Sequence, residues 1–181
     1  MKVSREQASR NREKVVETAS RLFRAHGVDG VGIGEVMRAC DLTHGGFYNQ
    51  FESKDALAAE ACAAALAKSA ARWSGIAAGA EDAAAAIADD YLSPRNRDAP
   101  QTGCALIALG PDAARKGGDL AGAFRKGFEE LAGILEQAGE MDRSAALARM
   151  AQMVGALVLA RAVGDADLSE EILQAARDAA G

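Results

Sequence analysis

One short segment carries most of the side chains that could contact a charged polymer. It reads LTHGGFYNQFESK over residues 42–54 and places two adjacent glycines ahead of two aromatic residues and a Ser-Lys pair. Asn and Gln can each form two hydrogen bonds with adenine, and tyrosine hydroxyl and lysine ammonium groups bind phosphate. A glycine inside a helix costs about 1 kcal/mol, which is tolerable where a larger side chain would hold the backbone away from a ligand. The candidate contact residues are Arg12, Thr43, His44, Gly45, Gly46, Tyr48, Asn49, Gln50 and Lys54.

Composition indicates that helices position these side chains. Alanine, the strongest helix former, occupies 43 of the 181 positions, and the first of only three prolines is Pro94. No segment alternates apolar and polar residues with the two-residue period of a strand. We therefore predict an all-α fold of about nine helices.

Apolar residues recur at helical spacing on both sides of the opening segment. Two short helices joined by a tight turn, with a longer helix in front, form a helix-turn-helix, whose second helix enters the major groove of DNA. A surface turn with two core aromatics fits the spacing equally well. The helices expected in this part of the chain are 10–25, 33–40, 44–50 and 54–74.

The residues between these helices are of types that end and begin helices. Gly27 suits a C-terminal cap, and Thr43 and Ser53 suit the N-terminal caps of the third and fourth helices. Lys54 is then expected at a helix start, where free backbone N–H groups favour an anion such as phosphate.

Charge is distributed unevenly along the chain. The formal net charge is −5, but residues 1–54 carry nine Lys and Arg against seven Asp and Glu, whereas residues 55–181 carry twelve against nineteen. A mildly basic head on an acidic body is compatible with DNA binding confined to one end. Arg5 and Arg10 are expected on a mobile arm that either follows the minor groove or is simply solvated, and Arg12 is expected to contact phosphate.

The segment and its surroundings resemble a known family. Residues 10–57 are similar to the DNA-binding domain of the TetR family of bacterial repressors, whose signature is a Gly-x-Phe/Leu-Tyr-x-x-Phe core followed by a lysine and an apolar residue. The resemblance implies a homodimer with a helix-turn-helix DNA-binding domain at residues 1–54 and a helical effector-binding and dimerisation domain at residues 55–181. It also implies that the recognition helix, Tyr48 and Lys54 contact operator DNA. The matching residues are Ala19, Leu22, Phe23, Gly27, Ile33, Met37, Gly45, Phe47, Tyr48, Phe51, Lys54 and Leu57.

Three positions depart from the family pattern. Gly32 stands in place of the Ser or Thr that usually caps the second helix, and it offers phosphate no hydroxyl. Asp41 stands in place of the turn glycine, which is tolerable because aspartate accepts the left-handed conformation better than most residues. Gln50 stands where histidine is frequent, so the phosphate contact made there in the family is not carried over.

The rest of the chain is expected to form a second group of helices. The helix at 143–163 is apolar around most of its circumference and needs cover on two sides. With the last helix it forms either half of a four-helix interface between two copies or part of a single-subunit core. The expected elements are a break at 74–82, a helix to about residue 92, a polar loop at 93–103, a brief helix ending at Gly110, and helices at 119–138, 143–163 and 168–180. The interface candidates are Met150, Met153, Val154, Leu157, Val158, Leu168, Ile172 and Leu173.

A small-molecule effector would need a cavity between the middle helices. The few aromatic residues after residue 51 could line it, with Arg125 meeting an acidic effector; packing in the core is the alternative. Residues 102–115, TGCALIALGPDAAR, resemble a segment of a TetR subgroup that includes electrophile-sensing repressors with a reactive cysteine. A helix N-terminus lowers the pKa of a thiol, but free cysteine is most often a small buried apolar residue. The pocket candidates are Trp73, Tyr91, Cys104, Phe124, Arg125 and Phe128.

Other classes of function find less support in the sequence. His26 and His44 are not paired with cysteines or carboxylates at metal-ligand spacing, and GVGIG does not match a dinucleotide fingerprint, so we expect no catalysis, metal or cofactor. Three widely spaced cysteines and a polar N-terminus favour a cytoplasmic protein without a membrane span. The alternative to a ligand-responsive repressor bound to operator DNA is a structural or partner-binding helical dimer without specific DNA binding.

Overall fold

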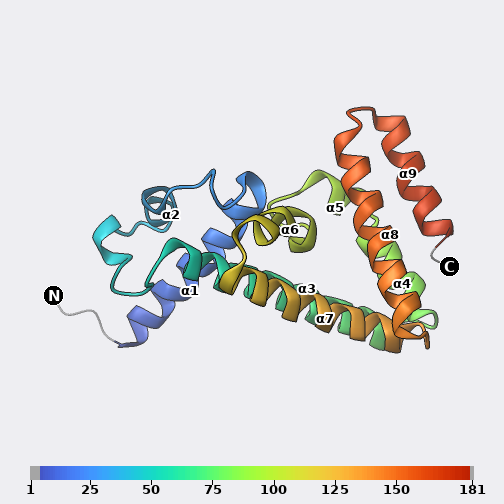
Figure 1. Cartoon of the computed structure of the whole chain (residues 1–181), viewed down its shortest axis with the longest axis horizontal. Coiled ribbons are helices and arrows are strands. Elements are labelled where there is room, and N and C mark those ends of the chain that lie inside the picture. The colour runs from blue at the N-terminus through green and yellow to red at the C-terminus, as the bar shows by residue number, and fades with distance from the viewer. Residues whose placement is uncertain (1–4, 180–181) are drawn as a thin grey trace.

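The computed structural model describes residues 5–179 and is helical throughout (Figure 1). Within this range it contains nine α-helices, one short 3-10 helix, η1, and no strand, so the prediction of an all-α fold is confirmed. The elements are α1 Arg5–His26, α2 Ile33–Ala39, η1 His44–Gly46, α3 Lys54–Gly79, α4 Ala83–Tyr91, α5 Pro94–Asp98, α6 Ala105–Lys116, α7 Gly118–Ala138, α8 Arg143–Ala162 and α9 Ala166–Asp178.

The first helix begins earlier than expected. α1 starts at Arg5, so Arg5 and Arg10 lie on a helix, and the prediction that a mobile arm carries them is wrong. The guanidinium of Arg10 pairs with Glu6 four residues before it and donates to Gln7, and such pairs stabilise the first turns of a helix. Residues 1–4 lie outside the described residues.

The structure confirms three of the local predictions and overturns one. Gly27 ends α1 with a φ of +73°, and Asp41 adopts the left-handed conformation with a φ of +59°. The Ser53 hydroxyl accepts a hydrogen bond from the Ala56 N–H at 3.0 Å, which caps α3. Thr43 forms no capping hydrogen bond with its side chain, because only the single 3-10 turn η1 follows it instead of the helix expected at 44–50.

Several boundaries in the second half differ from the sequence prediction. α3 continues through Ser74 and Gly75 to Gly79, and α5 forms inside the stretch expected to be a polar loop. α6 passes through Pro111 instead of ending before it. Leu109 and Ala113, on either side of this proline, are buried, and their packing offsets the hydrogen bond that proline cannot donate.

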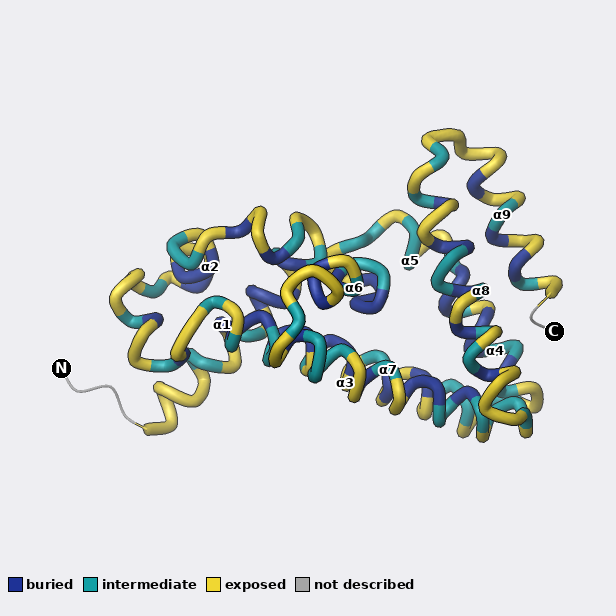
Figure 2. Tube along the Cα trace, viewed as in Figure 1, coloured by how far each residue is buried: buried dark blue, intermediate teal, exposed yellow. Residues whose placement is uncertain are grey.

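The long helices α3 and α7 lie side by side and form the base of the molecule (Figure 1). Figure 2 shows buried and exposed stretches alternating along both helices, as expected when one face of a helix lies in the core. α1 and α4 pack mainly on α3, while α6 and α8 pack mainly on α7. One connected cluster of buried side chains therefore extends from Phe23 and Phe47 to Met153.

Gly127 of α7 marks the closest approach between these two helices. A Cβ at this position would lie 2.5 Å from Cδ1 and 2.6 Å from Cβ of Leu66 on α3. Gly127→Val is therefore expected to destabilise the fold by about 3 kcal/mol, at the upper end of the usual overpacking penalty. Urea unfolding measures this effect; Gly133→Val on the same helix, where an added Cβ meets nothing within 4 Å, is the control. Equal unfolding midpoints for the two variants would contradict the assignment.

α8 and α9 form a hairpin whose inner face completes the core. Four of the interface candidates are fully buried within the subunit, because α7 and α9 cover α8 on two sides. The prediction that these four contact a second copy is wrong; the four are Met150, Met153, Leu157 and Leu173. Val158 and Leu168 are exposed, together with Leu159, which the sequence did not single out, and Val154 and Ile172 are half-buried.

α8 is also apolar along its whole length. Among the described helices it alone is long and apolar enough to cross a bilayer by length and composition, although the sequence suggested no such segment. A third of this stretch, 33%, is buried inside the subunit. Its apolar character is thus partly explained by its place against α7 and α9.

Candidate nucleic-acid interface

The segment after the turn at Asp41 is held to the core by two aromatic side chains. Phe47 and Phe51 are buried and stack with their ring centroids 5.4 Å apart, and Tyr48 meets the edge of Phe47 at 5.2 Å. Tyr48 itself is 63% exposed. The buried pair therefore fixes the backbone while the side chains between and before the two phenylalanines face solvent. The exposed members are Thr43, His44, Gly45, Tyr48 and Asn49.

The two glycines have no steric role inside the chain. A Cβ on Gly45 would meet no atom within 4 Å, and one on Gly46 would be only in ordinary contact, 3.5 Å from Oγ1 of Thr43. Neither glycine has a positive φ. Neither packing nor backbone conformation therefore requires a glycine at position 45.

Two candidates near the exposed segment, Arg12 and Gln50, have partners within the chain. Arg12 pairs with Glu60 at 2.5 Å, and its guanidinium lies 4.7 Å from the centre of the Phe51 ring. Gln50 donates to the Gly46 carbonyl at 3.4 Å, and its own carbonyl oxygen is buried without a partner. Lys54 is the first residue of α3 and half-buried. A phosphate would have to compete with Glu60 for Arg12.

Lys14 positions the turn, and the sequence gave no sign of it. Its ammonium group donates to the Cys40 carbonyl at 2.8 Å and to the Asp41 carboxylate at 3.1 Å, which ties α1 to the turn that precedes η1. The sequence pattern of a lysine on a solvated helix face is the same whether its ammonium group is free or paired. The contact depends on residues 26 and 27 positions later, so only the folded chain brings it about.

Comparison with known proteins agrees with this arrangement. Residues 15–61 match the family described as "Bacterial regulatory proteins, tetR family". The structure of a TetR transcriptional regulator from Chloroflexus aurantiacus is 26% identical, covers 96% of this chain and 95% of its own, and superposes with a TM-score of 0.80. Residues 15–61 thus form a TetR-family DNA-binding domain by similarity, and the chain as a whole has the fold of TetR regulators. The resemblance stated from residues 10–57 is thereby confirmed.

More distant structures share the fold of this chain over nearly its whole length. Reduced NemR from E. coli is 21% identical and covers 93% of this chain and 96% of its own, with a TM-score of 0.81. A TetR regulator from Legionella pneumophila is 19% identical and covers all of both chains, with a TM-score of 0.78. No curated protein sequence matches the chain.

α6 is tied to the N-terminal helix-turn-helix domain by a buried carboxylate. Asp112 is 2% exposed and accepts a hydrogen bond from the Val28 N–H at 2.9 Å, in the loop between α1 and α2. Arg115 pairs with the same carboxylate at 2.7 Å. One turn on, Lys116 pairs with Asp29 in that loop at 2.7 Å. The loop that precedes the helix-turn-helix thus rests on α6.

The predicted effector pocket is only partly assembled. Trp73, Tyr91 and Cys104 line one cavity of about 60 Å³ between α3, α4 and the start of α6. Arg125 is exposed on α7 and lies outside it. Phe124 and Phe128 are half-buried against the core, and Phe124 lies beside Gly110. Phe124, Arg125 and Phe128 therefore do not line the cavity at Trp73, Tyr91 and Cys104.

Cys104 lies at the start of α6, as the sequence suggested, but its thiol is not activated. Burial raises the pKa of the Cys104 thiol, and this effect outweighs the hydrogen bonds from the Tyr91 hydroxyl and the Ile107 N–H, which lower it. Of the two alternatives that the sequence left open, a thiol activated at a helix start and a buried core residue, burial favours the core residue. The Tyr91 hydroxyl lies 3.0 Å from the sulfur atom, in a buried contact. Cys40 and Cys62 are also buried.

Burial should also make the three thiols slow to react. Burial raises the pKa of Cys62 to about 11 and that of Cys104 above its usual value, so both remain neutral thiols at pH 8, and the thiolate is the reactive form. The native protein is expected to react with a disulfide reagent at pH 8 at least about tenfold more slowly than the unfolded chain, since one pKa unit changes the thiolate fraction about tenfold. One rapidly labelled thiol, mapped to Cys104, would instead indicate a sensor.

Proposed function

We propose that this TetR-family protein is a sequence-specific DNA-binding transcriptional regulator that represses as a homodimer and is released from its operator by a small molecule. The observation that carries the proposal is the exposed group at Thr43, His44, Gly45, Tyr48 and Asn49, set on a buried aromatic pair. Tyr48 and Asn49 have no hydrogen-bond partner in the described chain that would explain their types. DNA phosphates and base edges supply such partners. Such a protein acts where bacterial DNA lies, in the cytoplasm.

The contact residues divide by the part of DNA that they suit. Tyr48 and Lys54 suit phosphates, which fix the position of a protein without reading sequence. Asn49, next to Tyr48 on the exposed side, suits a base edge, where a good two-bond contact gives about 1–3 kcal/mol of discrimination. Gln50 and Arg12 contribute only if they exchange their present partners, Gly46 and Glu60, for DNA.

A homodimer would bring two such surfaces to one operator. Val158 and Leu159 on α8 and Leu168 on α9 are exposed apolar side chains on one hairpin, and Leu159 is 56% exposed. We place the dimer contact on this hairpin, flanked by the half-buried Val154 and Ile172. Two helix-turn-helix heads then read half-sites about 34–36 Å apart or a multiple of that spacing.

The response to a small molecule would pass through α6. α6 begins beside Trp73, Tyr91 and Cys104, and Asp112 in its second half holds the loop before the helix-turn-helix. A ligand that favours one position of α6 would thereby favour one position of the head. The coupling is reciprocal, so operator DNA should weaken effector binding by the factor by which the effector weakens operator binding.

Selection from random duplex DNA followed by binding measurements tests the proposal. The selected duplex should bind with an affinity that falls steeply with salt, because the neutralised phosphates release counterions. Tyr48→Phe and Lys54→Ala should weaken binding to all duplexes alike, whereas Asn49→Ala should reduce the preference for the selected sequence. If no sequence is enriched, the alternative of a structural or partner-binding helical dimer gains support.

A further inference from the structure

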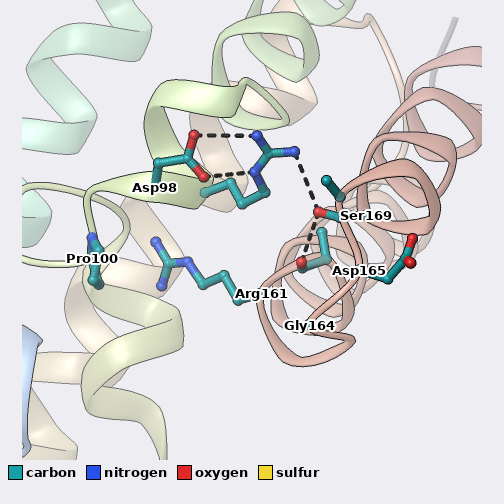
Figure 3. A pocket seen from close by; sticks show the side chains of 9 residues that line it. Asp98, Pro100, Arg161, Gly164, Asp165 and Ser169 are labelled. Atoms are coloured by element: carbon teal, nitrogen blue, oxygen red, sulfur yellow. Dashed lines mark hydrogen bonds and ion pairs between the residues drawn. The ribbon is translucent and has the colours of Figure 1, made fainter.

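A second cavity lies away from the helix-turn-helix, between α5, the loop after it, and the turn from α8 to α9 (Figure 3). Its volume is about 420 Å³, within the usual range of about 300–1,000 Å³ for small-molecule sites. Pro100, Ala160, Gly164 and Ala166 give it a largely apolar lining. It is open to solvent and shares no residue with the cavity at Trp73.

Most polar side chains of this cavity are already paired within the chain. Arg97 donates to the Asp98 carboxylate at 2.7 Å and to the Ser169 hydroxyl at 3.3 Å. Ser169 in turn donates to the Ala160 carbonyl at 2.7 Å, and these contacts are drawn in Figure 3. The Asp165 carboxylate accepts a backbone N–H of α9 at 2.8 Å and caps that helix. None of these groups needs a ligand to complete its hydrogen bonds.

Arg161 is the exception. Its guanidinium donates one hydrogen bond, from Nη2 to the Asn96 carbonyl, and its Nε is buried without a partner. Among the described residues, no carboxylate lies within ion-pair distance of it, and Figure 3 shows it extending toward Pro100 without a contact to any other side chain drawn. A Cβ on Gly103 would lie 2.8 Å from Nη2, so the loop backbone holds the guanidinium closely.

A half-buried cation without an anion is unfavourable. Burial lowers the pKa of Arg161, and the groups that oppose this effect, Cys104 and Tyr91, are both themselves buried and neutral at pH 7. Charged groups removed from water are normally paired with the opposite charge. An anion supplied from solution would provide this pair and give Nε its missing acceptor.

We propose that this cavity binds a small monocarboxylate, with Arg161 as its counter-charge. The charges around the cavity select the class: Arg97 and Arg161 are balanced by Asp98 and Asp165, so a second negative charge on the ligand would be repelled. The apolar lining suits a short hydrocarbon or aromatic tail. This site is additional to operator binding, and its occupancy is measured without DNA.

Calorimetric titration of the full chain with butyrate and benzoate tests the proposal. Saturable binding of at least one acid is expected, together with a rise in the thermal midpoint. The neutral butyramide should bind at least about tenfold more weakly than butyrate, because a hydrogen bond to a charged group is worth more than one to a neutral group. Absence of saturable binding by both acids, or tighter binding of inorganic phosphate than of either acid, overturns the proposal.

Variants locate the binding within the molecule. Arg161→Gln should weaken butyrate binding at least about tenfold, while Arg149→Gln, on the same helix but in a different cavity, should leave it unchanged. Ala166 lines the cavity from an exposed position, so Ala166→Leu should fill the cavity and block binding while the Arg161 guanidinium stays in place. This variant tests the proposal even if Arg161→Gln does not fold. Unchanged affinity in Ala166→Leu, or equal losses in Arg161→Gln and Arg149→Gln, contradicts the assignment.

Discussion

Gly45→Leu is expected to lower the affinity for operator DNA about a hundredfold while leaving the protein folded. A Cβ at this exposed position would meet no atom of the chain within 4 Å, but a leucine side chain would hold the recognition segment away from the groove. Losing one good base contact and weakening its phosphate neighbours removes about 2.8 kcal/mol, which corresponds to a hundredfold change. Fluorescence anisotropy with the selected duplex measures the affinity, and urea unfolding measures the stability.

The control for this prediction is Gly75→Leu. Gly75 is also exposed and an added Cβ there meets nothing within 4 Å, but it lies in the second half of α3. Its replacement should change operator affinity by less than about twofold, since surface substitutions usually alter free energies by less than about 0.5 kcal/mol. If both leucine variants bind operator like the unmodified protein, Gly45 is not part of a DNA surface.

Asp112→Ala is expected to reduce the free energy of unfolding by about 2 kcal/mol. The substitution leaves the buried Val28 N–H without an acceptor, and an unsatisfied buried donor costs about 1–3 kcal/mol. Asp112→Asn keeps an acceptor oxygen and should lose about half as much. Urea unfolding measures the difference in free energy.

Hydrogen exchange at Val28 shows whether the local contact is responsible. The Val28 amide should exchange faster in Asp112→Ala than in the unmodified protein, and amides in the second half of α3 should be less affected. Asp119→Ala, an exposed carboxylate in the first turn of α7, is the control and should change stability by less than about 1 kcal/mol. Unchanged exchange at Val28 would show that Asp112 does not hold the loop.

The helix-turn-helix was predictable because its signals are local. Gly27 and Asp41 affect only the backbone at their own positions, and Ser53 caps a helix that begins at the next residue. Their residue types therefore predict the end of α1, the turn and the start of α3. The prediction that Thr43 caps a helix was wrong, because a cap needs a helix after it. The chain there makes only one 3-10 turn before the buried Phe47.

Features that depend on distant contacts were less predictable. Helical spacing identifies the apolar face of α8 but does not say which helix covers it, so Met150 and Leu157 were assigned to a partner and proved to face the subunit's own core. The state of Cys104 depended likewise on burial, which outweighed the helix start that the sequence suggested. Asp112 and Lys14 gave no local signal, because their partners lie far away in sequence.

The uninterrupted course of α3 has a mechanical consequence. This helix carries Lys54 at one end and Trp73 in its second half, and at 1.5 Å per residue its length is about 39 Å. A rigid rod of that length that tilts by about 5° about one end displaces the other by about 3 Å, roughly the length of one hydrogen bond. In a regulator of the kind proposed, a small rearrangement around the indole ring would thereby be amplified into a shift large enough to move the lysine out of register with a phosphate.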